Sequence, residues 1–190
     1  RLARPGPDQT WFAPPQAPAP VSNSAPPVTE PMIPAPIPAD EEERLAALGE
    51  SHLLDTDAEL VFDRITAKLA RIFEVPIALL TLVDRDRQFF KNHSGLPEDL
   101  ARARHTSRDV SVCGHVVANN DVLVVEDLAR DRRFATNPVL QARGLRFYAG
   151  VPVEATPCTP LGSLYLLDHQ HRPPHPRPKP THHQPPPHLR

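Results

Sequence analysis

The clearest structural signal in the chain is the segment FDRITAKLARIFEVPIALLTLVDRDRQFFK, residues 62–91. Its first part, taken with the preceding Val61, places apolar residues at helical spacing, which predicts a helix that packs one stripe on a core: Val61, Ile65, Leu69 and Ile72. Pro76 ends this helix. Residues 77–83 (IALLTLV) are apolar on both faces, as in a central strand of a covered sheet. A turn at 84–86 and a partner strand at 88–93 complete a predicted hairpin.

Upstream, two features predict how the helices begin. Residues 40–54 (DEEERLAALGESHLL) place acids in a first turn, where the helix dipole favours them, and put Leu45, Leu48 and His52 on one face. Residues 56–59 (TDAE) have the form of a capping box, in which the threonine and glutamate side chains satisfy free amides at a helix start. We therefore expect two helices before the first strand.

Downstream, the pattern changes from an irregular, charged stretch at 96–106 to short alternating elements. The expected order is a short helix, a strand, a loop with a short helix and two strands, at 109–118, 122–125, 127–140, 146–154 and 161–167. Helices and strands in this order predict an α+β domain with a mainly antiparallel sheet covered by helices.

Proline divides the 190-residue chain into three parts. Of its 26 prolines, 12 lie in residues 1–38 and 8 in residues 169–190. Proline removes a backbone donor and is excluded from helix interiors, so neither end is expected to pack. We predict a disordered Pro/Ala-rich linker at 1–38, one domain at 39–168 and a disordered Pro/His-rich tail at 169–190. The start of the chain has neither a methionine nor an apolar signal core, which indicates a fragment.

Charge and cysteine content exclude several classes of protein. Residues 39–168 carry 15 basic and 21 acidic residues, and this acidic balance argues against a nucleic-acid partner. No apolar run is long enough to cross a bilayer, so we expect no membrane contact. Two cysteines are too few for a disulfide scaffold, which favours a reducing, cytoplasmic setting.

Six segments in order resemble the GAF domains of bacterial signalling proteins, especially those attached to histidine kinases and cyclic-dinucleotide enzymes. They are ERLAAL…LLDT, the segment 62–91, RDVSVCGHVV, LVVEDLARDRRFATNPVL, LRFYAGVPV and LGSLYLLD. The resemblance implies a six-stranded, mainly antiparallel sheet, with helices on one side and a ligand pocket on the other. It also implies regulation: a bound small molecule, a sensed chemical state or a partner contact shifts the state of a kinase or cyclase output domain, in cis or in trans.

Two features depart from the family. Its last strand usually leads into a long amphipathic helix that pairs in a dimer, whereas residues 169–190 are rich in Pro, His and Arg. A shifted reading frame is one hypothesis for this change, and an intact frame on re-sequencing would contradict it. Without that helix, dimerisation depends on residues 40–54, and we expect a weak homodimer or a monomer. Residues 157–160 (PCTP) stand where the family more often has a short turn with glycine.

Cys113 and His115 are the most reactive pair in the sequence. A Cys-x-His motif could bind a metal, or the histidine could activate the thiol, since a nearby imidazolium lowers a thiol's pKa. Residues two apart on a helix point to different faces, however, and zinc takes about four ligands. Lining of the pocket, or packing, is the preferred interpretation, and no metal site is predicted. The histidines of the tail are interpreted as part of a disordered segment.

The remaining candidates come from one loop and one strand. Asp127, Phe134 and Asn137 belong to a loop that lies over the pocket in the family; the alternative is a loop closed by its own hydrogen bonds. Phe147 and Tyr148 adjoin on a strand, so they face opposite sides of the sheet and one of them should reach the pocket. Gly150 would allow a close approach beside it.

These observations predict a regulatory domain rather than an enzyme. The sequence contains no phosphate-binding loop, nucleophile elbow or HExxH motif. The expected pocket is apolar and aromatic with few polar contacts, and the sequence names neither its ligand nor a cofactor. Three alternatives stay open: a ligand-free docking or dimerisation domain, a truncated product, and a thiol-dependent sulfoxide reductase on the same fold.

Overall fold

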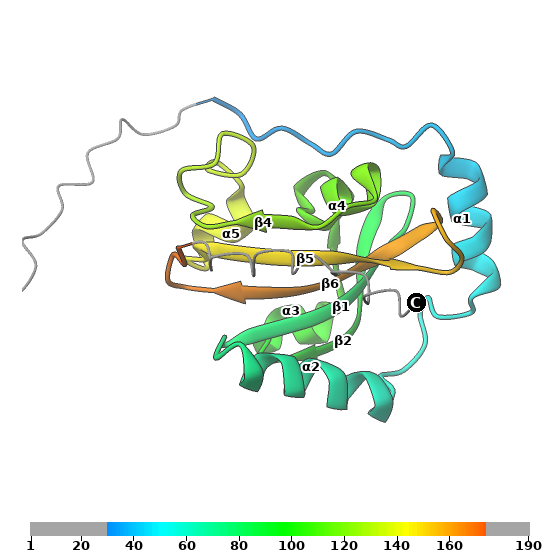
Figure 1. The fold of residues 1–190 in the computed structure, drawn as a ribbon, viewed down its shortest axis with the longest axis horizontal. Coiled ribbons are helices and arrows are strands. Elements are labelled where there is room, and N and C mark those ends of the chain that lie inside the picture. The colour runs from blue at the N-terminus through cyan, green and yellow to red at the C-terminus, as the bar shows by residue number, and fades with distance from the viewer. Residues whose placement is uncertain (1–29, 174–190) are drawn as a thin grey trace, which may run out of the picture.

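The structure is a computed structural model that describes residues 30–173 of the 190-residue chain. Its centre is one six-stranded sheet in the order β3-β2-β1-β6-β5-β4, with antiparallel neighbours throughout (Figure 1). The strands are β1 (Ile77–Val83), β2 (Arg87–Ser94), β3 (His105–Ser107), β4 (Leu123–Val125), β5 (Phe147–Glu154) and β6 (Pro160–Asp168). The expected α+β fold with a six-stranded antiparallel sheet is confirmed.

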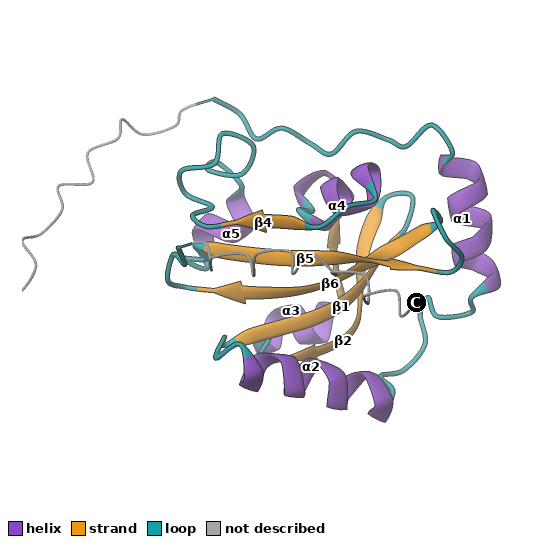
Figure 2. Cartoon of the chain, in the orientation of Figure 1, coloured by secondary structure: helices purple, strands orange, loops and turns teal. Residues whose placement is uncertain are grey.

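Helices cover both faces of this sheet (Figure 2). On one face lie α1 (Glu41–Glu50) and α2 (Leu60–Ile72). The other face carries the largest apolar core and three short helices: α3 (Glu98–Ala103), α4 (Cys113–Asn119) and α5 (Pro138–Ala142). Side chains alternate along a strand, so Ile77 and Leu79 of β1 enter this core while Ala78 and Leu82 face α2 and α1. All seven residues of β1 are buried, as its apolar sequence predicts.

The expected packing of α2 is wrong in its orientation. Val61, Ile65 and Ile72 are 56, 40 and 57% exposed, while Thr66 is fully buried and Leu69 is half-buried. The apolar side of this helix also includes Phe62 and is broader than one stripe, and the side that meets the sheet is displaced from its centre toward Thr66 and Ala70. The contact is made instead through the side centred on Thr66, whose hydroxyl donates to the backbone of its own helix.

The expected capping box is also wrong. The helix begins at Leu60, and its N-cap residue Glu59 makes no side-chain cap hydrogen bond. Thr56 is engaged elsewhere: its hydroxyl donates to the Leu53 carbonyl at 2.8 Å and accepts from the buried Nζ of Lys91. The demand of a buried ammonium for acceptors therefore outweighs the local capping pattern.

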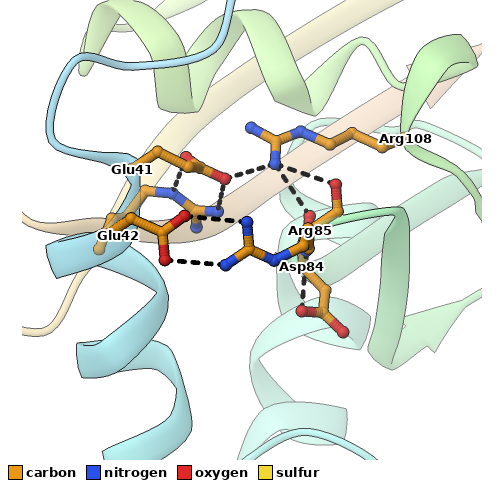
Figure 3. Close-up of polar contacts among 6 residues, drawn as sticks. Glu41, Glu42, Asp84, Arg85 and Arg108 are labelled. Carbon is orange, nitrogen blue, oxygen red and sulfur yellow. Dashed lines mark hydrogen bonds and ion pairs between the residues drawn. The ribbon is translucent and has the colours of Figure 1, made fainter.

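The predicted helix at 40–54 is shorter than expected and is anchored by charge. Leu48 is buried as expected, but His52 lies beyond the end of α1 and is exposed. Glu41 and Arg44, on the first turns of α1, are buried with Arg108 of the 3-10 turn η1 (Arg108–Val110). Figure 3 shows the Glu41 carboxylate between the two guanidinium groups.

Residues on both sides of the expected domain limits contact the domain. The N-terminal strap, residues 30–38, runs across α4, where the Ile33 amide donates to the Arg133 carbonyl at 3.2 Å. Gly114 permits this passage, because a Cβ there would lie 2.8 Å from the Ala35 side chain. Arg172, beyond β6, donates to the carbonyls of Phe73 and Glu74 at the end of α2. Residues 1–29 and 174–190 lie outside the described residues, so the expected disorder there stays a prediction.

The stretch 96–106, expected to be irregular, forms α3 and the edge strand β3. Arg104 joins the two in a left-handed conformation with φ of 59°. In the turn between β5 and β6, Cys158 likewise adopts a φ of 70°, at the position where glycine would be unstrained. Within residues 30–173, none of the helices has the length and apolar character needed to cross a bilayer.

Candidate ligand pocket

A cavity of about 60 Å³ lies between the sheet and the three short helices. Its walls are mainly apolar and come from β1, β2, α3, α5 and β6, with Ile77, Phe90, Leu100, Leu140 and Leu167 among them. Its volume is well below the roughly 300–1,000 Å³ of pockets that hold drug-sized ligands. In this conformation the pocket is therefore too small for a ligand of that size.

The polar part of the cavity is a buried hydrogen-bonded cluster around the Cys113 thiol. The Sγ atom lies 3.3 Å from Gln88 Nε2, 3.4 Å from Tyr148 Oη and 3.5 Å from Thr81 Oγ1. Gln88 also donates to Tyr165 Oη at 2.9 Å, and its Oε1 accepts from the Ser111 hydroxyl. Four of these residues, Gln88, Cys113, Tyr148 and Tyr165, line the cavity. They come from β2, α4, β5 and β6, so the fold, rather than any local motif, assembles the cluster.

Burial sets the protonation of this cluster. It raises the pKa of the Cys113 thiol, and hydrogen bonds from Tyr148 and Thr81 oppose the change only in part. Burial also raises the pKa values of Tyr148 and Tyr165 well above their usual range. All three groups are uncharged at neutral pH. The pocket thus offers neutral hydrogen-bond donors and acceptors, and its thiol is not in the form that attacks electrophiles.

The expected close approach at Gly150 is observed. A Cβ at this position would lie 2.4 Å from Tyr148 Oη and 2.9 Å from Ser163 Oγ. The missing side chain lets the Tyr148 ring fold over β5, where its hydroxyl meets Ser163 Oγ at 3.3 Å. Tyr148 also stacks on Tyr165, with ring centroids 5.2 Å apart. Gly150 therefore positions one of the four polar residues of the cavity.

Of the seven residues predicted from sequence, Cys113 and Tyr148 line the cavity. His115 is buried on α4 but does not line it. Its Nε2 lies 3.1 Å from the Ile33 carbonyl of the N-terminal strap, and its ring meets Phe134 edge-on at 5.0 Å. Because a carbonyl only accepts, His115 must carry its proton on Nε2. His115 and Phe134 thus hold the strap on the domain.

The other three candidates make contacts outside the cavity. Asp127 forms a bidentate ion pair with Arg146 at 2.5 and 2.7 Å. Asn137 is fully buried; its Oδ1 caps α5 and its Nδ2 donates to the Val110 carbonyl. Phe147 lies on the opposite face of the sheet, where Arg172 stacks on its ring. The alternative in which the loop is closed by its own hydrogen bonds describes Asp127 and Asn137, and a ligand role for any of the seven residues stays a prediction.

Sequence reasoning missed Gln88 and Tyr165, the two cavity residues that hold the cluster together. The sequence carries little signal for Gln88, because it is one of several polar residues in β2 (RQFFKNHS), although the structure buries it at 4% exposure. Among the described residues, no group of three His, Cys, Asp or Glu side chains is placed to hold a metal ion.

Comparisons with known proteins agree with this architecture. The sequence model of the GAF domain family matches residues 57–184. Cyclic di-GMP phosphodiesterase PA2567 of Pseudomonas aeruginosa is 36% identical over 144 residues, which cover 75% of this chain and 24% of that protein. The chain thus spans about a quarter of the length of this relative.

Two solved structures illustrate the likeness in fold. The GAF domain/HD domain protein from Geobacter sulfurreducens has a TM-score of 0.50 and 15% identity, over 65% of this chain and 82% of that one. Free methionine-R-sulfoxide reductase from Neisseria meningitidis has a TM-score of 0.48 and 19% identity, over 68% of this chain and 74% of that one. At 15% identity, the Geobacter sulfurreducens structure is alike in fold alone. The family match, which covers more than half of the residues, assigns the chain to the GAF domain family.

Proposed function

We propose that the chain is the sensory domain of a bacterial signalling protein and that it binds a small molecule in the cavity beside Cys113. The observation that carries this proposal is the neutral polar cluster of Gln88, Cys113, Tyr148 and Tyr165 in a mainly apolar cavity. Burying polar groups costs free energy unless each is hydrogen-bonded. A domain that only needed a core would be served by apolar side chains at these positions.

The volume and the charge of the cavity limit which ligands could bind. A volume of about 60 Å³ admits only a compact molecule unless the covering helices separate. The cluster carries no charge, so it favours a ligand with neutral hydrogen-bonding groups. Arg143 is the charged residue that lines the cavity. It pairs with Asp99 of α3, and this ion pair links α3 to the end of α5 beside the cavity. An anionic ligand would therefore have to compete with Asp99.

The relative in Pseudomonas aeruginosa supports a link to cyclic-dinucleotide signalling. That protein is a cyclic di-GMP phosphodiesterase about four times as long as the matched region. We infer that the output controlled by this chain is an enzyme of cyclic-dinucleotide metabolism, present in cis in a longer protein or supplied in trans. A cytoplasmic setting fits such an output and fits the two free cysteines.

The sulfoxide-reductase alternative needs a nucleophilic thiolate. Burial raises the pKa of Cys113, which is the opposite of the shift that activates a catalytic cysteine. Cys158 is exposed on the turn between β5 and β6 and does not line the cavity. Both facts support a regulatory role over thiol catalysis.

Native mass spectrometry of the chain purified from its own host tests the proposal. We expect a bound mass that disappears on denaturation and that is reduced in a Gln88→Leu variant. Gln141→Leu is the matched control, because Gln141 lies on α5 but does not line the cavity. A bare chain mass, together with no thermal shift in metabolite screens, would instead favour the ligand-free docking domain.

A further inference from the structure

The outward side of α2 is the most apolar exposed surface on a single element of the described chain. Five of the ten large hydrophobic residues that remain exposed lie in residues 60–73: Leu60, Val61, Ile65, Ile72 and Phe73. We call their surface the α2 face. It lies on the side of the sheet opposite to the cavity, because α2 packs against Ala78 and Leu166 rather than against the core beside α4.

The same helix carries an unpaired positive charge. Arg64, Lys68 and Arg71 are exposed, and none of them has a hydrogen bond or ion pair within residues 30–173. The one acid within α2, Asp63, turns toward the sheet and accepts from Asn92 at 2.7 Å. The α2 face is therefore both apolar and basic.

The two kinds of residue form adjacent stripes along the helix. On a helix with 3.6 residues per turn, Val61, Ile65 and Ile72 fall on one line. Arg64, Lys68 and Arg71 fall on a neighbouring line, three and four residues apart. At about 1.5 Å per residue, the apolar stripe from Val61 to Ile72 is about 16 Å long, and the basic stripe from Arg64 to Arg71 runs beside it for about 10 Å. A second helix laid alongside would contact both stripes over this length.

We propose that the α2 face binds an amphipathic helix of a partner protein, in which an apolar stripe runs beside an acidic one. The apolar stripe supplies the area removed from water, and the acidic stripe pairs with Arg64, Lys68 and Arg71. Charge complementarity of this kind fixes the register of two helices and rejects partners of the wrong charge. No ligand in the cavity is needed, so this interaction stands apart from the sensory function proposed above.

Arg172 places the chain that leaves β6 at the end of α2. Its guanidinium donates to the Phe73 carbonyl at 2.8 Å and to the Glu74 carbonyl at 2.5 Å, at the end of α2. The chain that leaves β6 is thereby held beside the α2 face. Residues 174–190 contain Arg177, Lys179 and Arg190 and no acid, so this chain does not itself contain the acidic stripe there.

Two other occupants fit the charges less well. A second copy with its α2 alongside would bring one basic stripe near another. An anionic lipid surface would attract the stripe but repel the domain as a whole, because residues 39–168 hold 15 basic and 21 acidic residues. An acidic helix meets neither difficulty.

Two synthetic peptides test the proposal. Both carry leucine at the apolar positions of a helical repeat; one carries glutamate along the flanking stripe and the other carries lysine. Binding of each labelled peptide is measured by fluorescence anisotropy, and its site is mapped by amide NMR shifts. We expect the acidic peptide to bind with shifts on α2 and the basic peptide not to bind. Ile65→Glu should abolish binding and Lys68→Glu should weaken it roughly tenfold.

Val124→Glu is the matched control. Val124 is 54% exposed on the edge strand β4, compared with 40% for Ile65, and the Val124→Glu variant should bind the acidic peptide as the unmodified chain does. Ile65→Ala keeps the charge of the surface and checks that any loss comes from lost contact, while circular dichroism verifies the fold of each variant.

Several outcomes would overturn the proposal. One is failure of the acidic peptide to bind, and another is equal binding of both peptides or binding that survives Ile65→Glu. Sedimentation with phosphatidylserine vesicles that is lost in Lys68→Glu would assign the α2 face to a lipid surface. A dimer by light scattering that Ile65→Glu dissociates would assign it to a second copy.

Discussion

Glu41, in the first turn of α1, accepts a hydrogen bond from Arg108, 67 residues later in the 3-10 turn η1 (Figure 3). The same carboxylate accepts from Arg44 at 2.8 and 2.9 Å. Only two residues separate η1 from Cys113, which lines the cavity. This buried contact therefore joins the N-terminal helix directly to the segment that carries the pocket thiol. A shift of residues 108–113 on ligand binding would move α1.

Replacing Glu41 should destabilise the domain strongly. Glu41→Gln leaves two buried guanidinium groups without a counter-charge, and we expect a loss of about 3 kcal/mol in the free energy of unfolding. Glu42→Gln is the control, because Glu42 pairs with the exposed Arg85 and its removal should change little. Urea unfolding of both variants measures the difference. Equal stability of the two would contradict the buried role of Glu41.

The same residue predicts a pH dependence. Burial alone would raise the pKa of Glu41, but hydrogen bonds from Arg44 and Arg108 outweigh it and lower the pKa from 4.5 to about 2. A carboxyl whose pKa is lower in the folded state stabilises the fold above its unfolded value and loses that contribution as pH falls. Stability should therefore drop between pH 4.5 and about 2. Unfolding measured across this range should show a shallower drop for Glu41→Gln.

Two glycine substitutions should act in opposite directions. In Gly150→Ala the new methyl group would lie 2.4 Å from Tyr148 Oη, so the ring must leave its place and we expect a loss of about 1–3 kcal/mol. Gly49→Ala, in α1, meets nothing within 4 Å and should stabilise the helix by about 0.5–1 kcal/mol. Thermal unfolding monitors both. A neutral Gly150→Ala would mean that Tyr148 is not held as described.

The two thiols should differ in reactivity. Cys158 is exposed, whereas Cys113 is 1% exposed and its pKa is raised by burial. Alkylation of the native protein should therefore add one label, at Cys158, and unfolding should release the second site. Mass spectrometry of peptides reads both positions, and Cys158→Ser should leave the native protein unlabelled. Rapid labelling of native Cys113 would revive the thiol-dependent alternative.

Loss of His115 should free the N-terminal strap. Burial lowers the pKa of His115, so the ring is mostly neutral at pH 7, and its Nε2 is hydrogen-bonded to the Ile33 carbonyl. His115→Ala removes that hydrogen bond and also the edge-on contact between the His115 and Phe134 rings. The Ile33 amide, which donates to the Arg133 carbonyl, should then exchange its hydrogen faster. His105→Ala, an exposed histidine on β3, should leave this exchange unchanged.

The sheet could be predicted from sequence where local patterns and burial agree. The run at 77–83 is apolar without interruption, and only a covered central strand accommodates it. The predicted α2 stripe is wrong because the apolar side of the helix is broad, so spacing alone does not fix which part of that side meets the sheet. The helix α3 was missed because it is only six residues long, three of them charged, and Leu100 alone is too little for a periodic apolar signal.

The pocket could be predicted only in part, for a different reason. Tyr148 was a candidate because alternation along β5 sends it and Phe147 to opposite faces. The side chains of Gln88 and Tyr165 are hydrogen-bonded although β1 lies between their strands, β2 and β6. No local sequence pattern predicts a contact between residues so far apart in the chain. The contact of His115 with the N-terminal strap likewise depends on residues 82 positions apart.

The last strand in sequence, β6, is inserted between β1 and β5. While the chain is being synthesised, the β1–β2 hairpin and the β4–β5 pair can form, but they share no edge until residues 160–168 have left the ribosome. Completion of the sheet therefore waits for these residues, and it is slow because its pairings are distant in sequence. A ribosome that stopped before residue 160 would release two half-sheets with open apolar edges, a species prone to aggregate rather than a smaller folded domain.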